Sequence, residues 1–112
     1  MSAFQRIPVA QAVALLAQES AARLVDIRDP VSFSQAHVAG AYHLTNDTLA
    51  AFLTSVELDD PVLVLCYHGH SSQSVAQYLC SQGLSRVFSV DGGFVQWSLE
   101  QPASLANQQQ EA

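Results

Sequence analysis

VLVLCYHGHSS occupies residues 62–72, and the rest of the chain can be interpreted outward from it. Its first four residues, Val62 to Leu65, are all apolar, which is typical of a strand buried on both faces of a sheet. A polar loop containing Gly69 follows, and an amphipathic helical pattern begins at about Ser72. The stretch therefore predicts a strand, a tight loop and a helix, with Cys66 at the carboxyl end of the strand.

The position of Cys66 between a strand and a helix N-terminus predicts a reactive thiolate. The first turn of a helix presents unpaired backbone N–H groups and the positive end of the helix dipole, and both stabilise negative charge. Gly69 lets the loop amides converge on one point, and Ser71 and Ser72 add hydroxyl donors. Such groups lower the pKa of a thiol without a cationic side chain. The residues alone also leave open a buried, purely structural cysteine, which is common for this residue type.

Apolar runs and helical patterns alternate along the whole chain. Strands are expected at residues 4–7, 23–27, 42–44, 62–65 and 86–90, and helices at 9–18, 31–36, 47–52, 72–82 and around Phe94 and Trp97. This alternation predicts an α/β domain whose central parallel sheet is flanked by helices on both faces. We expect one domain over residues 1–100 and a flexible C-terminal tail over residues 101–112, where little can be buried.

Composition argues against several classes of partner. Only 12% of the 112 residues are charged, and ten acidic side chains face four arginines, which gives a net charge of -6. Nucleic acids and anionic membranes require clustered cations, so neither is an expected partner. Two cysteines are too few for a disulfide scaffold, and we expect a cytoplasmic protein. Cys80 falls on the apolar face of its helix and is expected to be a buried small hydrophobe, not a disulfide partner of Cys66.

Two other chemistries could use the loop after Cys66. A cysteine phosphatase needs an arginine six residues after its cysteine to clasp phosphate, and Ser72 occupies that position. A metal site on Cys66, His68 and His70 is disfavoured, because alternate residues of one tight loop rarely converge on a single ion. We interpret His68 and His70 as hydrogen-bonding or rim groups, and a general-base role for either stays open.

Several segments, taken in order, resemble the signatures of the rhodanese superfamily. They are residues 26–29 (DIRD), 37–41 (HVAGA), 66–72 (CYHGHSS) and 91–94 (DGGF), the last followed by Trp97. The short length, residues 43–49 (HLTNDTL) and the Cys-Tyr-His-Gly loop are most similar to the single-domain thiosulfate sulfurtransferases of the GlpE type. The resemblance covers about residues 4–100 and implies a rhodanese-like α/β domain with its reactive cysteine at Cys66.

The resemblance also implies a reaction. Cys66 would take sulfane sulfur from thiosulfate or another donor, release sulfite, and pass the sulfur from a persulfide to cyanide or a dithiol such as a thioredoxin-like protein. The implied substrate-binding residues are Tyr67, His68, Gly69, His70, Ser71 and Ser72. No metal or organic cofactor is implied. Gln73 departs from the family pattern, in which a lysine often follows the paired serines, so we expect weaker attraction for dianionic thiosulfate.

A second hypothesis comes from a different class of protein. A rhodanese-like module could be non-catalytic and bind a protein partner, or relay persulfide sulfur within a larger assembly. The intact Cys66 and its glycine-containing loop favour the enzyme.

The other residues of the family-like segments are assigned to the scaffold. Asp26 and Arg28 are expected to point to opposite faces at a strand end and to pair with partners elsewhere in the fold. Gly92 and Gly93 are expected to supply the dihedral angles of a turn.

Overall fold

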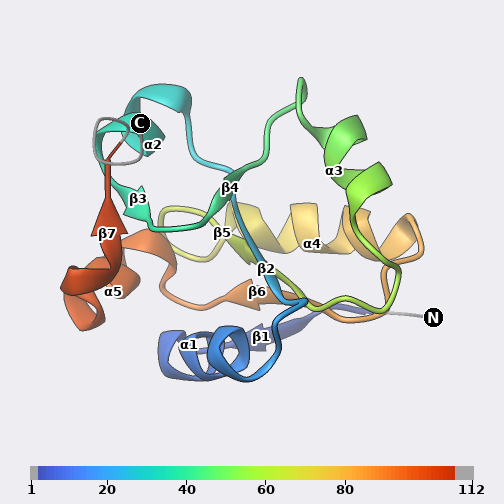
Figure 1. The fold of residues 1–112 in the computed structure, drawn as a ribbon, viewed down its shortest axis with the longest axis horizontal. Coiled ribbons are helices and arrows are strands. Elements are labelled where there is room, and N and C mark those ends of the chain that lie inside the picture. The colour runs from blue at the N-terminus through green and yellow to red at the C-terminus, as the bar shows by residue number, and fades with distance from the viewer. Residues whose placement is uncertain (1–2, 108–112) are drawn as a thin grey trace.

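A parallel sheet of five strands forms the centre of the molecule (Figure 1). The computed structural model describes residues 3–107. The strands lie in the order β1, β6, β5, β2, β4, and each neighbouring pair is parallel. Their bounds are Gln5–Ile7 (β1), Arg23–Asp26 (β2), Tyr42–His43 (β4), Val62–Leu65 (β5) and Val87–Val90 (β6). The strand that precedes Cys66 is thus the middle strand of the sheet.

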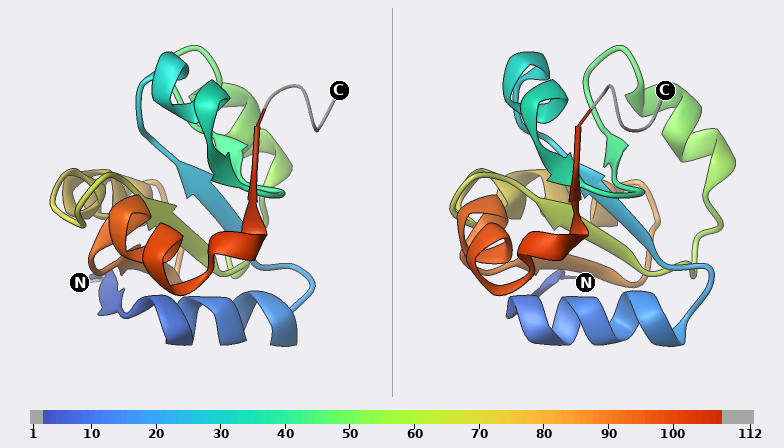
Figure 2. Two further views of the ribbon diagram at one scale, coloured as in Figure 1. Left: turned by 90° about the vertical axis from the view of Figure 1, so that its left-hand side faces the viewer. Right: turned by 60° about the vertical axis from the view of Figure 1, so that its left-hand side comes forward.

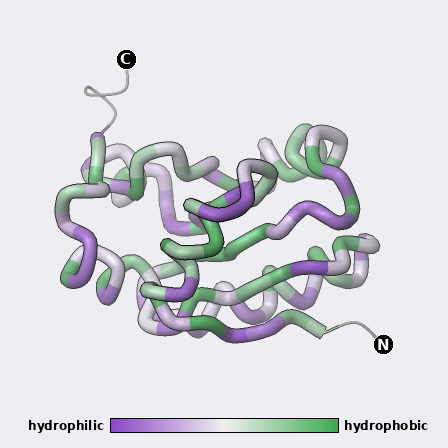
Figure 3. Tube along the Cα trace, turned by 60° about the horizontal axis from the view of Figure 1, so that its bottom comes forward, coloured by the Kyte–Doolittle hydropathy of each residue, from purple (hydrophilic) through white to green (hydrophobic). Residues whose placement is uncertain are grey.

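Helices cover both faces of this sheet, which confirms the predicted fold class (Figure 2). Their bounds are Val9–Gln18 (α1), Pro30–Gln35 (α2), Leu49–Ser55 (α3), Ser71–Ser81 (α4) and Gly93–Glu100 (α5). Helices α3 and α4 pack on one face, and α1 and α5 pack on the other. Hydrophobic and hydrophilic residues alternate at short intervals along the helices (Figure 3), as expected where one side of a helix is buried. Within residues 3–107, no helix has the length and apolar character needed to cross a bilayer.

Strand β5 divides its side chains between the two faces of the sheet. Val62 and Val64 lie in the core under α3 and α4, whereas Leu63 and Leu65 lie in the core under α1 and α5. All four residues are completely buried. Because side chains alternate along a strand, the next residue, Cys66, is directed to the α4 side.

Residues 101–107 correct the expectation of a loose tail. Pro102–Ser104 form a short 3-10 helix, and Leu105–Ala106 form strand β7, which pairs antiparallel with strand β3, His37–Val38. The indole N–H of Trp97 donates to Ser104 Oγ at 3.1 Å, and Leu105 packs against the core on the α1 and α5 face. The strand that pairs with β7 lies far from it in the sequence, so the composition of residues 101–107 could not predict that they form regular structure. Residues 108–112 of the expected tail lie outside the described residues.

Helix α3 begins later than the sequence predicts. A helix was expected over residues 47–52, but it starts at Leu49, and Thr48 occupies the N-cap position. The N–H of Thr45 donates to Thr48 Oγ1 at 2.8 Å, and the Thr48 hydroxyl donates to the His43 carbonyl at 3.0 Å. These hydrogen bonds form a turn in place of the expected first helical residues.

Candidate active site

The loop after β5 wraps around the sulfur of Cys66. The N–H of Gly69 donates to Sγ at 3.1 Å, and the N–H of Ser72 donates to it at 3.3 Å. The hydroxyl oxygen of Ser72 lies 3.2 Å from the same sulfur. Ser72 stands in the first turn of α4, so two of these three contacts come from a helix N-terminus. The structure therefore brings Cys66, Gly69 and Ser72 together at one point.

Burial and hydrogen bonding act in opposite directions on the pKa of Cys66. The residue is only 3% exposed, and burial by itself raises the pKa of a thiol because the thiolate loses water. The hydroxyl of Ser72 and the backbone N–H groups of Ser72, Gly69 and His68 stabilise the thiolate. Their combined effect outweighs burial and lowers the pKa below the ordinary value of a cysteine. The loop is thus a cradle for negative charge built from backbone and hydroxyl dipoles.

The other loop side chains lie at the surface. His68, His70 and Ser71 are exposed, and Tyr67 is 39% exposed. Among residues 3–107, no group of three or more histidine, cysteine, aspartate or glutamate side chains is placed to hold a metal ion. The structure therefore does not gather the side chains of His68 and His70 around the sulfur, and only the backbone of His68 acts on it.

Tyr67 ties the loop to helix α2. Its phenol donates to Asp29 Oδ2 at 2.5 Å and lies 2.7 Å from the hydroxyl of Ser32. Asp29 is also the N-cap of α2, because its Oδ1 accepts the N–H of Ser32 at 2.8 Å. The phenol of Tyr67, followed by the N–H and the hydroxyl of Ser32, lowers the pKa of Asp29 from 3.8 to about 2.

Replacing Tyr67 with phenylalanine is expected to raise the pKa of Asp29 toward 3.8, because the phenol is the largest cause of its depression. A carboxylate whose pKa is lowered by folding stabilises the folded state above its unfolded pKa, and this contribution is lost as the pH falls through the folded value. Compared with the wild type, the variant should therefore be less stable above about pH 4, and the difference in stability should shrink as the pH falls from about 4 to about 2. A carbon-13 NMR titration of the Asp29 carboxyl measures the pKa directly. Tyr78→Phe, an exposed tyrosine on α4, is the control, and equal Asp29 pKa values in both variants would contradict the assignment.

The turn after β6 and the start of α5 are hydrogen-bonded to the loop that follows β5. The N–H groups of Phe94 and Val95 donate to the carbonyl oxygens of Cys66 at 2.6 Å and Tyr67 at 3.1 Å. This close approach requires glycine at position 93, since a Cβ there would lie 2.5 Å from the Cys66 carbonyl oxygen and from two backbone atoms of Tyr67. The turn glycine predicted from the sequence therefore also makes room for the loop that follows β5.

Asp26 and Arg28 correct a third expectation, because they pair with each other. Arg28 Nη2 lies 2.8 Å from Asp26 Oδ2, and both residues are buried. Residues two apart in a strand share a face, and β2 in any case ends at Asp26, so the chain beyond it can bend the guanidinium back. That guanidinium lies 3.7 Å from the ring centre of Phe94 and also donates to the Ala36 carbonyl at 2.7 Å. The ion pair therefore holds the Arg28 guanidinium against the ring of Phe94, the residue whose backbone N–H binds the Cys66 carbonyl.

Two further residues contact the cradle: Ser89, which the sequence analysis missed, and Gln73, which it considered only as a replacement for lysine. The hydroxyl of Ser89, in β6, lies 2.7 Å from that of Ser72, and both residues are completely buried. The amide of Gln73 donates to the Gly69 carbonyl at 2.8 Å. A hydroxyl inside the otherwise apolar run of β6 was a signal that could have identified Ser89.

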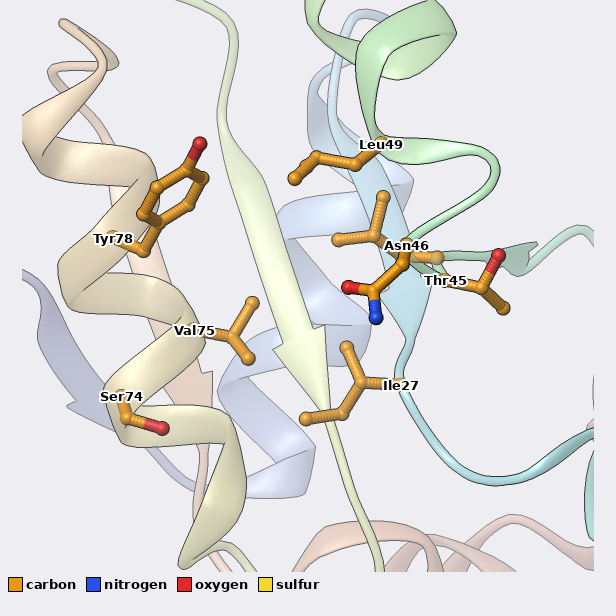
Figure 4. A pocket seen from close by; sticks show the side chains of 8 residues that line it. Ile27, Thr45, Asn46, Leu49, Ser74, Val75 and Tyr78 are labelled. Carbon is orange, nitrogen blue, oxygen red and sulfur yellow. The ribbon is translucent and has the colours of Figure 1, made fainter.

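A separate pocket of about 650 Å³ opens between α3 and α4. Figure 4 shows Ser74, Val75 and Tyr78 of α4 on one side and Leu49 of α3 nearby. The complete lining consists of Ile27, Leu44, Thr45, Asn46, Leu49, Ser74, Val75 and Tyr78. No residue of the loop from Cys66 to Ser72 lines this pocket, so it is distinct from the cradle around the sulfur.

Similar sequences cover most of the chain. The chain is 58% identical over 97 residues to a protein named thiosulfate sulfurtransferase GlpE from Tolumonas auensis, covering 87% of this chain and 91% of the relative. It is 53% identical over 106 residues to a protein of the same name from Pseudomonas putida, covering 95% of this chain and 96% of the relative.

Solved structures share the fold. A rhodanese-like domain protein from Staphylococcus aureus has a TM-score of 0.72 at 22% identity, over 83% of this chain and 90% of the other. The rhodanese-like domain of Alr3790 from Anabaena has a TM-score of 0.79 at 19% identity, over 91% of this chain and 78% of the other. The rhodanese-like domain profile matches residues 9–100. With this match and the relatives above 50% identity, the chain belongs to the rhodanese-like domain family.

Proposed function

We propose that this protein is a thiosulfate sulfurtransferase that carries sulfane sulfur on Cys66 as a persulfide. The observation that carries the proposal is the convergence of two backbone amides and the Ser72 hydroxyl on one sulfur atom. This arrangement keeps a thiolate available as a nucleophile, and it also suits the terminal negative charge of a persulfide. Relatives above 50% identity that are named thiosulfate sulfurtransferase support the choice of donor.

The first half-reaction transfers one sulfur atom to the enzyme. The Cys66 thiolate attacks the outer sulfur of thiosulfate and forms a new S–S bond to it. The bond between the two sulfur atoms of thiosulfate breaks, and its electron pair leaves with sulfite. One negative charge plus two gives a persulfide anion plus the sulfite dianion, so charge and atoms balance. The loop amides stabilise the anion before and after transfer.

The second half-reaction returns the thiolate. A thiophile attacks the outer sulfur of the persulfide, and the electron pair of the broken S–S bond stays on Cys66. Cyanide would leave as thiocyanate, and a dithiol such as a thioredoxin-like protein would take the sulfur as its own persulfide. Both half-reactions pass through one covalent state, so steady-state kinetics should be ping-pong.

Mass spectrometry of the intact protein tests this function. After incubation with thiosulfate and removal of excess donor, the protein should gain one sulfur atom, located on Cys66 by peptide mapping. Cyanide should then remove it and release an equal amount of thiocyanate. A chain that gains no sulfur from thiosulfate would support the alternative of a non-catalytic or persulfide-relay module. Loading by a persulfide donor would then separate the relay from a pure binding module.

An aryl phosphate assay separates sulfur transfer from phosphatase chemistry. Ser72 occupies the position where a cysteine phosphatase needs arginine, and the nearby Arg28 is paired with Asp26. We therefore expect no hydrolysis that depends on Cys66.

Replacing Gln73 with lysine is expected to lower the KM for thiosulfate roughly fivefold at low ionic strength, because a cation beside the cradle attracts a dianion. The lysine keeps a donor for the Gly69 carbonyl, which Gln73 now binds at 2.8 Å. Salt should reduce the gain by screening the charge. Gln77→Lys, one turn farther along α4 and exposed, is the matched control. Equal KM values for the two variants would refute a local effect at position 73.

We also propose that the protein works in the cytoplasm on small anions and thiols, without nucleic acid or membrane as partner. Its net charge of -6 disfavours polyanions, and neither Cys66 nor Cys80 forms a disulfide. Cell fractionation with an antibody to the protein tests the location.

A further inference from the structure

The hydroxyl of Ser89 extends the site beyond the loop. Ser89 lies in β6 and pairs in register with Val64 of β5, two residues before Cys66. Its side chain faces α4, as does that of Val87 two positions earlier, which belongs to the core on that face. The oxygen atoms of Ser89 and Ser72 are 2.7 Å apart, and that of Ser72 is 3.2 Å from Cys66 Sγ. The sulfur and the two hydroxyls therefore form a continuous chain of hydrogen bonds from the end of β5, through the first turn of α4, to β6.

We propose that Ser89 is a positioning residue for sulfur transfer, and that it orients the Ser72 hydroxyl toward Cys66. The inference rests on the proposed function only in taking Cys66 as the reacting group. Ser89 does not touch the sulfur in this structure, so its effect passes through Ser72.

The chain of hydroxyls can match either charge state of the sulfur. With a thiolate, Ser72 donates to sulfur, and Ser89 donates to the oxygen of Ser72. With a neutral thiol, the S–H donates to Ser72, and Ser72 donates to Ser89. Each donor in such a chain polarises the next, so the Ser89 hydroxyl strengthens the hydrogen bond that Ser72 makes to negative sulfur. Reversal needs only rotation of two hydroxyl groups and moves no heavy atom.

Burial gives this orientation its importance. Ser72 and Ser89 are both 0% exposed, and Cys66 is 3% exposed. A buried hydroxyl that loses one partner cannot turn to bulk water for another. Ser72 must accept a hydrogen bond in order to be fully paired while it donates to the thiolate, and Ser89 is placed to supply one.

Replacing Ser89 with alanine is expected to raise the pKa of Cys66 by about half a unit, and to slow alkylation of Cys66 by iodoacetamide at neutral pH about threefold. Ser72→Ala should raise the pKa by about one unit or more, because it removes a hydrogen bond to a charged group. The pKa is measured by thiolate absorbance against pH. Ser81→Ala, an exposed serine at the far end of α4, should leave the pKa unchanged.

The double variant separates a positioning role from a general structural one. If Ser89 acts through Ser72, adding Ser89→Ala to Ser72→Ala should produce no further shift in the pKa. An equal shift with and without the Ser72 hydroxyl would overturn the proposal, and so would an unchanged pKa in the single variant. If Ser89→Ala does not fold, Ser89→Cys takes its place in the experiment. Ser89→Cys keeps a similar volume and a weak donor, so the pKa of Cys66 should rise by a smaller amount.

These titrations do not depend on sulfur transfer. Persulfide formation by the wild-type protein with thiosulfate is measured separately by mass. A wild-type chain that gains no sulfur would refute the proposed function while the pKa values still decide the role of Ser89.

Discussion

Replacing Cys66 with alanine or serine is expected to reduce sulfur transfer from thiosulfate at least about a thousandfold, because no other group on the loop can form the covalent intermediate. A serine at this position would have a hydroxyl that stays protonated near neutrality and is a weak nucleophile toward sulfur. The fold should survive either change. The sulfur is held by hydrogen bonds from the loop and from Ser72 and does not support the core, where the preceding residue, Leu65, stays buried. Thiocyanate formed from thiosulfate and cyanide measures turnover, and circular dichroism checks the fold.

Cys80 provides the matched control for this experiment. It is 6% exposed and packs in the core with Ala76, Leu79 and Leu84 on the α4 side of the sheet. Cys80→Ala should lose about 1 kcal/mol of stability from the small cavity and keep its turnover. If Cys66→Ala turns thiosulfate over as fast as the wild type, or if Cys80→Ala is the inactive variant, the mechanism proposed for Cys66 is wrong.

Replacing Gly93 with alanine is expected to damage both the fold and the reaction. The new Cβ would lie 2.5 Å from the carbonyl oxygen of Cys66 and from the carbonyl carbon and oxygen of Tyr67, all of them backbone atoms. The backbone at position 93 has a φ of +60°, which adds the strain that an L-residue meets in the left-handed region. We expect a loss of about 2–4 kcal/mol in the free energy of unfolding.

The effect of Gly93→Ala on the reaction follows from the same contacts. The N–H of Phe94 holds the Cys66 carbonyl at 2.6 Å, so pushing that carbonyl away moves the sulfur relative to the loop amides. A misplacement of about 1 Å can reduce a rate about a hundredfold. Persulfide formation should slow by that order, and the pKa of Cys66 should rise because the amides of Gly69 and Ser72 no longer converge on it. Stopped-flow mixing with thiosulfate measures the rate, and urea denaturation measures stability.

Gly40 is the control for backbone strain alone. It has a φ of +85°, but a Cβ there would meet no atom within 4 Å. Gly40→Ala should lose about 1–2 kcal/mol of stability and leave sulfur transfer unchanged. Suppose that Gly93→Ala folds and that its rate of persulfide formation and its Cys66 pKa equal those of Gly40→Ala. The turn after β6 would then not position the loop.

The five strands of the central sheet and the five α-helices could be predicted from the sequence, because each depends on local patterns. The apolar run of β5 is long enough to be buried on both faces, and the helical period after Ser72 is clear. The cradle followed from the same logic, since a loop between a strand and a helix N-terminus presents amides wherever it occurs. Strand β7 could not be predicted, because it depends on a distant partner, β3, that lies beside it. The turn of Thr45 and Thr48 delays α3 through side-chain hydrogen bonds that compete with the helix.

The sequence alone determines an α/β domain with a cysteine at the carboxyl end of a buried strand. The reason is that the hydrophobic period and the loop composition depend only on residues that are neighbours along the chain. The contacts around that cysteine depend on tertiary structure. Ser89 of β6 contacts Ser72 of α4, Gly93 at the start of α5 leaves room for the Cys66 carbonyl, and the Arg28 guanidinium lies against the ring of Phe94. Each of these contacts joins groups whose distance in space is set by sheet order and helix packing, which residue spacing along the chain does not specify.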